Sequence, residues 1–324
     1  MMMSICFSVN DHYVQHLAVA IVSILKNNPQ HLFHFYILNS GISQQNQNRL
    51  LLLKNKNCQI DFIRINMKEF KKFHLAPQTH VTLESYFRFK IIPLFPKLDK
   101  ILYLDCDLLV LGDLQKIYKT DLKNNWFAMV PDAYCHGEHL KVSPYYNAGV
   151  LLFNLKKCRD DKVYDLLTKT SSYKGIDLRF MDQCILNFVA KGHICTLPEY
   201  FNCQLHPNMK TRCQRIQSQI KKVLILHYTS ELKPWLYDYP HPFSKYYFHY
   251  LKISPWHHEY VQIKSRQRQD RIKQWKHFLC RYERTSKTDK LKLTGITLFK
   301  REHRKTHMCK YFILGIPVWK KHIL

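Results

Sequence analysis

The sequence predicts an α/β fold in which a sheet with parallel strands is flanked by helices. In the first half of the chain, short apolar runs alternate with segments of helical length and helical hydrophobic period. Glycine is scarce, at 8 of 324 residues, and no glycine-rich phosphate-binding pattern is present. A bound nucleotide would therefore be held more by side chains and a metal ion than by a glycine-rich loop.

Each element is assigned from the spacing of its apolar residues, with Ser43 as a capping residue at one helix start. The predicted strands are Ile5–Val9, Phe33–Leu38, Ile60–Ile65, Lys100–Leu104, Phe127–Val130, Val150–Leu155 and Val223–His227. The predicted helices are Val14–Asn27, Ser43–Lys54, Leu83–Leu94, Lys157–Tyr173 and Met181–Lys191. Ligands of such sheets bind beyond the carboxyl ends of the strands, where Asn10, Asp105 and His227 lie.

The chain is strongly basic, with 50 Lys and Arg against 24 Asp and Glu and a formal net charge of +26. Residues 241–324 contain 20 of these Lys and Arg but only 5 Asp and Glu. The excess predicts an anionic partner, and it belongs mainly to the C-terminal region. We expect a globular domain over residues 1–240 and a basic, aromatic, helical extension over residues 241–324.

The cysteines indicate a reducing environment. There are 11 of them, an odd number, and no pair has C-x-x-C spacing, so a disulfide framework is not expected. The N-terminal segment has no basic start or small-residue cleavage site, and it is too short and polar to span a bilayer. A cytosolic compartment is the simpler interpretation.

The most informative segment is Lys100–Leu111, in which an apolar strand runs into Asp105 and Asp107. Residues two apart in an extended segment point the same way, so both carboxylates would project from one side. Two hard oxygen ligands suit Mg²⁺ or Mn²⁺, which commonly also binds substrate phosphates. D-x-D also occurs by chance in loops where aspartates cap turns, but uncompensated carboxylates are costly beside an apolar strand.

A second polar segment follows the predicted strand Val223–His227. His227 ends that strand, and a neutral imidazole is a good ligand for Mn²⁺. Lys233, six residues further on, can place a positive charge on a phosphate. A histidine at a strand end is also often a packed or hydrogen-bonded residue, so its role as a ligand depends on its combination with the acid pair.

Six segments in one order give the sequence a family resemblance over residues 4–240. They are Phe7–Tyr13, Tyr86–Lys90, Leu102–Asp107, Tyr146–Leu155, Met181–Asn187 and His227–Trp235. Together they resemble glycosyltransferase family 8, and most closely its bacterial lipopolysaccharide and lipooligosaccharide galactosyl- and glucosyltransferases. The resemblance implies a GT-A type fold, with a Rossmann-like mixed sheet that binds a UDP-sugar. It also implies Mn²⁺, with Mg²⁺ as an alternative, and hexose transfer with retention of anomeric configuration.

The resemblance also assigns roles to single residues. Asp105, Asp107 and His227 match the metal ligands, and Asp105 also belongs to the donor site. The other matched positions surround the donor: Ser8, Asn10 and Tyr13 at the uracil and ribose, Arg88 as a basic contact, Lys233 at the diphosphate, and Asp132, Asn147, Asp182 and Gln183 around the sugar. Each also has a structural interpretation; Asn10, for example, could simply cap the following helix.

Two positions depart from the family pattern. The family often has Asp where this chain has Asn10, which leaves one nucleobase or ribose contact open. It usually has Gly where this chain has Ser230, at a point where the backbone approaches the diphosphate. The second departure concerns the phosphate contact and not the metal ligands.

Retention of configuration leaves two reaction routes. A double displacement needs a nucleophile, and the candidate catalytic residues are Asp182 and Gln183, although an amide is a poor nucleophile. In a front-face route, the leaving phosphate deprotonates the acceptor hydroxyl while the metal and Lys233 stabilise departing UDP. We favour the front-face route.

The C-terminal region mixes aromatic and basic residues, which suits docking on an anionic membrane surface. We therefore expect a cytoplasmic enzyme, peripheral at the inner face of the bacterial inner membrane, that acts on a lipid-linked oligosaccharide acceptor. A solvated basic helix is the simpler alternative for this region. The rival functions are a nucleic-acid-binding protein and a metal-dependent sugar-nucleotide hydrolase. Nucleic acid is not an expected partner, because the acid pair has no role there.

Overall fold

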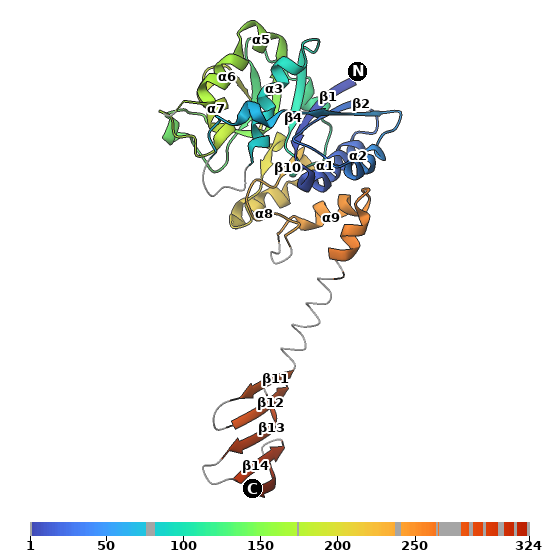
Figure 1. Ribbon diagram of the computed structural model, residues 1–324, viewed down its shortest axis with the longest axis vertical. Helices are drawn as coiled ribbons and strands as arrows, with labels where there is room; N and C mark the ends of the chain where they lie inside the picture. Colours follow the sequence, from blue (N-terminus) through green and yellow to red (C-terminus); the bar gives the residue numbers. More distant parts are fainter. Residues whose placement is uncertain are drawn as a thin grey trace. The chain divides into compact units, whose positions relative to one another are not determined.

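The chain forms two compact units, Met1–His258 and Glu259–Leu324. The computed structural model describes residues 2–75, 82–173, 175–236, 241–263, 265, 280–284, 288–293, 296–303, 308–313 and 316–322. The first unit contains a mixed sheet with its helices, and the second contains an antiparallel sheet (Figure 1).

A seven-stranded mixed sheet forms the centre of the first unit, in the order β3-β2-β1-β4-β7-β6-β8. Its strands are β1 (Met2–Val9), β2 (Leu32–Asn39), β3 (Cys58–Arg64), β4 (Lys100–Leu104), β6 (Phe127–Pro131), β7 (Tyr146–Asn154) and β8 (Ile194–Thr196). β1 pairs in parallel with β2 and β4, whereas β7 is antiparallel to both β4 and β6. Nearly every residue of β1 and β7 is buried, because both faces of the sheet are covered.

Helices cover the two faces of this sheet. They are α1 (Val14–Asn27), α2 (Gln44–Leu51), α3 (Phe87–Leu94), α4 (Gln115–Tyr118), α5 (Leu155–Asp160), α6 (Val163–Ser171), α7 (Met181–Val189), α8 (Lys210–Ser218) and α9 (Ser244–Lys252). Short 3₁₀ turns cover Asp11–Tyr13, Met67–Phe70, Leu83–Tyr86, Glu138–Leu140, Glu199–Phe201 and Ile220–Lys222. In Figure 1, α5, α6 and α7 lie on one side of the sheet, and α1 and α2 lie on the other.

A small second sheet lies beside the large one. Its strands are β5 (Leu108–Val110), β10 (Ile225–His227) and β9 (Cys203–Gln204), with β10 in the middle. β5 follows β4 after only three residues, and His227 is the register partner of Leu108. This pairing brings the end of β10 next to the loop between β4 and β5.

The predicted strands are found within a few residues of their expected bounds, and the sheet is mixed, as the family resemblance implied. Ser43 caps α2 as predicted, since its hydroxyl accepts from the Asn46 backbone N–H at 3.4 Å. Two predicted helices are interrupted. The segment 83–94 begins as a 3₁₀ turn, and the segment 157–173 divides into α5 and α6 because Lys162 adopts a left-handed backbone with φ of 53°.

The predicted domain boundary lies at residue 240, whereas the first unit continues to His258. The first unit continues past residue 240 because the following residues contact earlier parts of the same unit. The Asn27 amide donates to the Tyr250 hydroxyl of α9 at 2.7 Å. The Arg49 guanidinium lies 4.2 Å from the centre of the Trp256 ring, in cation–π contact.

The second unit differs from the expected helical extension. Its described residues from 280 onward form a five-stranded antiparallel sheet, so the helical prediction is wrong there. The strands are β11 (Cys280–Arg284), β12 (Thr288–Leu293), β13 (Ile296–His303), β14 (Met308–Ile313) and β15 (Ile316–His322). Tyr282, Leu291, Phe299, Ile313 and Ile316 are register partners across all five strands. Apolar partners in one cross-strand row favour a sheet over a helix.

Among the described residues, no helix is both long enough and apolar enough to span a membrane.

His16 anchors the packing of α9 on α1. Its Nδ1 lies 2.7 Å from the Tyr247 hydroxyl, and its ring stacks on Trp235 at a centroid distance of 3.7 Å. Burial lowers the pKa of His16 to about 3, although Asp107 acts in the opposite direction. An unfolded histidine titrates near 6.5, so between these values only the unfolded chain binds this proton.

We predict that His16→Gln makes folding less sensitive to acid. In the native protein the free energy of unfolding falls as the pH drops below about 6.5, by up to about 1.4 kcal/mol per pH unit for one proton. Urea unfolding at several pH values between 6.5 and 4.5 should show a shallower slope for the variant. The exposed His12→Gln is the control and should keep the native slope. Equal slopes for all three proteins would contradict the prediction.

Candidate functional site

A cleft of about 590 Å³ opens at the carboxyl ends of β1 and β4. Every site residue predicted from the sequence lines this cleft: Ser8, Asn10, Tyr13, Arg88, Asp105, Asp107, Asp132, Asn147, Asp182, Gln183, His227 and Lys233. The cleft therefore combines residues that lie more than 200 positions apart in the chain. They form three parts: a central cluster and one group of residues on each side of it.

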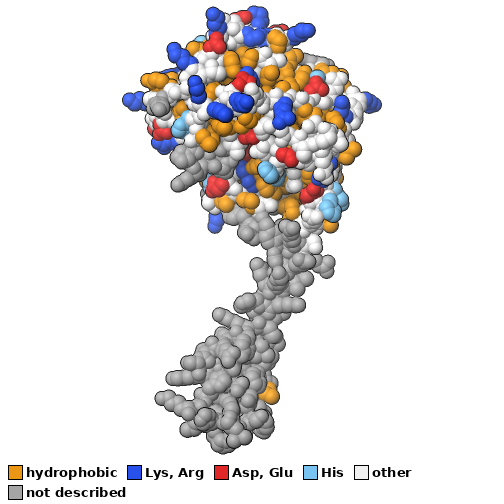
Figure 2. Space-filling view, viewed as in Figure 1, with side chains coloured by type: hydrophobic (Ala, Val, Ile, Leu, Met, Phe, Trp, Pro, Cys, Tyr) orange, Lys and Arg blue, Asp and Glu red, His pale blue; other side chains and the backbone are white. Residues whose placement is uncertain are grey.

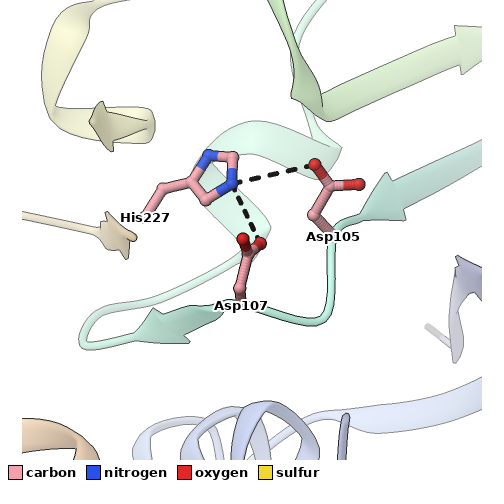
Figure 3. Close-up of side chains that lie close together, drawn as sticks. All are labelled: Asp105, Asp107 and His227. Carbon is pink, nitrogen blue, oxygen red and sulfur yellow. Dashed lines mark hydrogen bonds and ion pairs between the residues drawn. The ribbon is translucent and has the colours of Figure 1, made fainter. Parts of the chain in front are cut away.

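Asp105, Asp107 and His227 form the central cluster (Figure 3). His227 Nε2 lies 3.1 Å from Asp107 Oδ1 and 3.7 Å from Asp105 Oδ2. One ligand atom from each residue lies within 4.8 Å of the others, as a shared metal ion requires. The loop between β4 and β5 supplies the two carboxylates, and the end of β10 supplies the imidazole.

Gly149 makes room for this cluster. It lies in β7, and its carbonyl accepts from the Asp105 backbone N–H at 2.9 Å. A Cβ at this position would overlap the His227 ring and lie 2.7 Å from Asp105 Oδ2. Only a glycine allows β7 to approach the two ligands so closely.

Lys233 neutralises one of the carboxylates. Its Nζ lies 2.6 Å from Asp107 Oδ2, and the lysine is buried. Burial alone would raise the pKa of Asp107, but Lys233 and His227 outweigh it and hold that pKa well below its usual range. Asp107 is therefore ionised throughout the neutral range, as a metal ligand must be.

Arg88 joins the other carboxylate to Asp182. Its Nη2 donates to Asp105 Oδ1 at 2.9 Å, and its Nε lies 3.1 Å from Asp182 Oδ2. The guanidinium also lies 4.4 Å from the centre of the Tyr103 ring. Burial raises the pKa of Asp182, and Arg88 opposes that rise. Asp182 is thus a buried, paired carboxyl rather than a freely exposed one.

Asp132, Asn147 and Gln183 form the second part of the cleft, which we call the sugar wall. Gln183 Nε2 and Asn147 Nδ2 both donate to Asp132 Oδ2, at 3.1 and 3.2 Å. Gln183 Oε1 accepts from the Ala148 backbone N–H at 3.0 Å. These bonds hold three polar side chains in one orientation on the cleft wall.

Ser8, Asn10 and Tyr13 lie in the third part of the cleft, at the end of β1. Ser8 Oγ and Asn10 Oδ1 are buried and have no hydrogen-bond partner among the described residues. Buried polar atoms without partners are uncommon in proteins, so these two are suited to a polar ligand. Tyr13 packs edge-on against Trp235, which follows Lys233 in the chain.

Several residues of the site were not found from the sequence. Asn202 is fully buried and lies 3.0 Å from His227, yet it follows no motif and is separated from His227 by 25 positions. His206 and Ser85 also line the cleft. Gly149 lines the cleft and Trp235 packs against Tyr13, and each lies in a segment that carries the family resemblance, which is the signal that could have found them.

The family model described as glycosyl transferase family 8 matches residues 4–239. The chain belongs to glycosyltransferase family 8. A solved structure of the galactosyltransferase LgtC, in complex with donor and acceptor sugar analogs, has 29% identity and a TM-score of 0.68. It covers 78% of this chain and 96% of that protein. This match places the GT-A fold of LgtC on the first unit.

Curated relatives agree with this family. A putative glycosyltransferase of Haemophilus influenzae is 27% identical over 72% of this chain and 73% of its own length. The lipopolysaccharide 1,2-glucosyltransferase of Escherichia coli K12 is 28% identical, covering 78% of this chain and 79% of its own length. The family and these relatives make the chain a hexosyltransferase.

We predict that Gly149→Ala weakens metal binding by the candidate ligands Asp105, Asp107 and His227 without unfolding the sheet. The new methyl group displaces His227 or Asp105, so Mn²⁺ affinity measured by electron paramagnetic resonance should fall at least about tenfold. Gly112→Ala, where the nearest atom is the flexible Leu224 side chain, is the matched control and should bind Mn²⁺ like the native protein. Native Mn²⁺ affinity in Gly149→Ala would refute the cluster geometry.

Proposed function

We propose that the chain is a retaining, Mn²⁺-dependent transferase that moves galactose or glucose from a UDP-sugar to a lipopolysaccharide or lipooligosaccharide acceptor. The observation that carries the proposal is the order of the three groups in one cleft. Ser8 Oγ and Asn10 Oδ1, which have no hydrogen-bond partner among the described residues, suit a nucleobase and ribose. The central cluster suits a diphosphate with its cation. The polar wall around Asp132 suits a sugar.

The central cluster fits a divalent ion by its donor set. Two carboxylates and one imidazole suit Mn²⁺, and Mg²⁺ would rely mainly on the carboxylates. The space that Gly149 leaves beside His227 and Asp105 is a further sign that the ligands must converge. When bound, such an ion supplies positive charge to the leaving diphosphate.

Lys233 is the residue of this chain best placed to stabilise departing UDP. It is buried in the cleft and has Asp107 as its carboxylate partner among the described residues. A diphosphate in the central part of the cleft offers the ammonium group a second anionic partner. Preorganised positive charge of this kind lowers the barrier to leaving-group departure.

The surroundings of Asp182 and Gln183 favour the front-face route. Asp182 is 4% exposed and paired with Arg88, while both polar atoms of Gln183 are engaged by Asp132 and Ala148. In this route the bond from the anomeric carbon to the phosphate oxygen breaks, and the acceptor hydroxyl attacks from the same face. The proton of that hydroxyl passes to the leaving phosphate, and Asp182 and Gln183 orient the sugar.

Relatives support the acceptor class. The relatives include a lipopolysaccharide 1,3-galactosyltransferase of Salmonella typhimurium, 26% identical over 79% of this chain and 79% of its own length. A glycan acceptor also suits the rim of the cleft, where Tyr134 and His206 contribute aromatic rings. Aromatic faces with nearby polar groups are common in binding pockets.

We predict sugar transfer that depends on a divalent ion and on Asp107. The purified chain, given a panel of UDP-sugars with Mn²⁺ and truncated lipooligosaccharide, should glycosylate the acceptor with retained configuration, read by NMR. Asp107→Asn should lower turnover about hundredfold or more, by analogy with loss of one transition-state contact. EDTA should stop turnover and added Mn²⁺ should restore it.

Two outcomes of this assay would contradict the proposal. Release of sugar into water, without transfer to any acceptor, would favour the hydrolase alternative. Turnover that is unchanged in EDTA and in Asp107→Asn would remove the metal from the reaction. Exposed Asp121→Asn is the matched control for a change of one carboxylate.

We further propose that the second unit docks the enzyme on the cytoplasmic face of the bacterial inner membrane. Figure 2 shows Lys and Arg spread over the visible face of the first unit without one dominant patch. More than half of the formal charge excess, +15 of +26, lies in residues 241–324, which have 20 Lys and Arg against 5 Asp and Glu. In the sheet of that unit, Ile313 is 50% exposed and belongs to the apolar register row. Basic charge beside exposed apolar residues suits an anionic interface.

We predict that the chain binds vesicles of phosphatidylcholine with phosphatidylglycerol, and not phosphatidylcholine alone. Each basic residue near such a surface contributes about 1 kcal/mol, so Lys320→Glu with Lys321→Glu should weaken binding at least about tenfold. Lys54→Glu with Lys56→Glu changes the net charge equally in the first unit and is the control. Tighter, salt-sensitive binding to random oligonucleotides than to vesicles would favour the nucleic-acid alternative.

A further inference from the structure

Asn202 connects the central cluster with the sugar wall formed by Asp132, Asn147 and Gln183. Its side chain is fully buried just before β9. Its Oδ1 lies 3.0 Å from His227 Nδ1, and its Nδ2 donates to Asn147 Oδ1 at 2.9 Å. Asn147 in turn donates to Asp132. A continuous chain of hydrogen bonds thus runs from the sugar wall to a predicted metal ligand.

The donor and acceptor of each hydrogen bond in this series are fixed by groups that can only donate or only accept. The Gly149 backbone N–H can only donate, and it lies 3.0 Å from Asn147 Oδ1. Asn147 therefore presents its oxygen on this side, and Asn202 must present its NH₂ group to that oxygen. At the other end, Asn147 Nδ2 donates to Asp132 Oδ2 at 3.2 Å, which agrees with this orientation of the Asn147 amide.

The orientation of Asn202 then determines the tautomer of His227. With its NH₂ group directed to Asn147, Asn202 has only its carbonyl oxygen available for the imidazole, so His227 Nδ1 must carry a hydrogen. A neutral His227 consequently has its lone pair on Nε2. That is the atom that faces Asp105 and Asp107.

We infer that Asn202 is a positioning residue that holds His227 in the metal-binding tautomer and ring orientation. Hydrogen-bond partners of ligating histidines commonly fix both properties, and their loss costs about 10–100-fold in metal affinity. The inference rests on the proposed function for the presence of the ion, whereas the hydrogen-bond chain is a property of the described residues.

The test is Mn²⁺ affinity, read from the electron paramagnetic resonance signal of free Mn²⁺ with and without UDP. Asn202→Ala removes both hydrogen bonds, and affinity should fall about 10–100-fold. Asn202→Leu keeps the branching pattern of the side chain and has no hydrogen-bonding group, so it gives the same test without a cavity. Asn202→Asp keeps an oxygen for His227 and loses only the donor to Asn147, so it should restore affinity to within a few-fold of the native value.

Asn28→Ala is the matched control, because Asn28 is equally buried and hydrogen-bonded but lies outside the cleft. It should be destabilised without any change in Mn²⁺ affinity. Native affinity in Asn202→Ala or Asn202→Leu would overturn the inference, and so would an Asn202→Asp variant as weak as Asn202→Ala. If the native protein itself binds no Mn²⁺ with or without UDP, the proposed metal site fails rather than the role of Asn202.

Discussion

The arrangement of the cleft depends on the contact between β7 and the end of β4. β7 runs antiparallel to β4, and at Gly149 it passes beside Asp105 and His227 with no space for a side chain. The same strand carries Asn147, whose amide orients Asn202. One strand therefore fixes two ligands of the central cluster and one residue of the sugar wall. A shift of this strand would disturb all three at once.

Charge pairing is the second condition for this arrangement. Two carboxylates close together in a buried cleft repel each other by several kcal/mol at an effective dielectric constant near 20. Here each carboxylate has its own cation, since Arg88 pairs with Asp105 and Lys233 pairs with Asp107. Arg88 and Lys233 thus offset this repulsion and hold the two predicted ligands in place before any ligand binds.

Much of the fold and of the site could be predicted from the sequence, because strand ends are readable from apolar runs. The strand that ends before Asp105 and the strand that ends at His227 were located in this way, and their polar ends meet in the structure. The contacts that β7 makes as an antiparallel strand beside β4 could not be predicted from the sequence. Nothing local in the sequence marks Asn202, whose contacts arise only where the residue before β9 meets Asn147 of β7 and His227 of β10.

The C-terminal unit shows a different limit of sequence patterns. Basic and aromatic residues were interpreted as a helix from composition, but the row that includes Leu291 and Phe299 becomes visible only through strand register. Short strands with period-two patterns are weaker signals than long amphipathic helices. The prediction therefore failed where the pairing of neighbouring strands, rather than the composition of one segment, decides the structure.

Under the proposed function, the charges of the cleft also explain why a donor and a cation would bind together. A divalent ion alone must compete with Lys233 for Asp107, and a diphosphate alone must approach two carboxylates. A diphosphate with two negative charges and an ion with two positive charges add no net charge to the cleft. Asp107 would then help to hold the ion, and Lys233 would be able to contact the phosphate. Each ligand removes the electrostatic cost of the other, so their affinities are linked reciprocally.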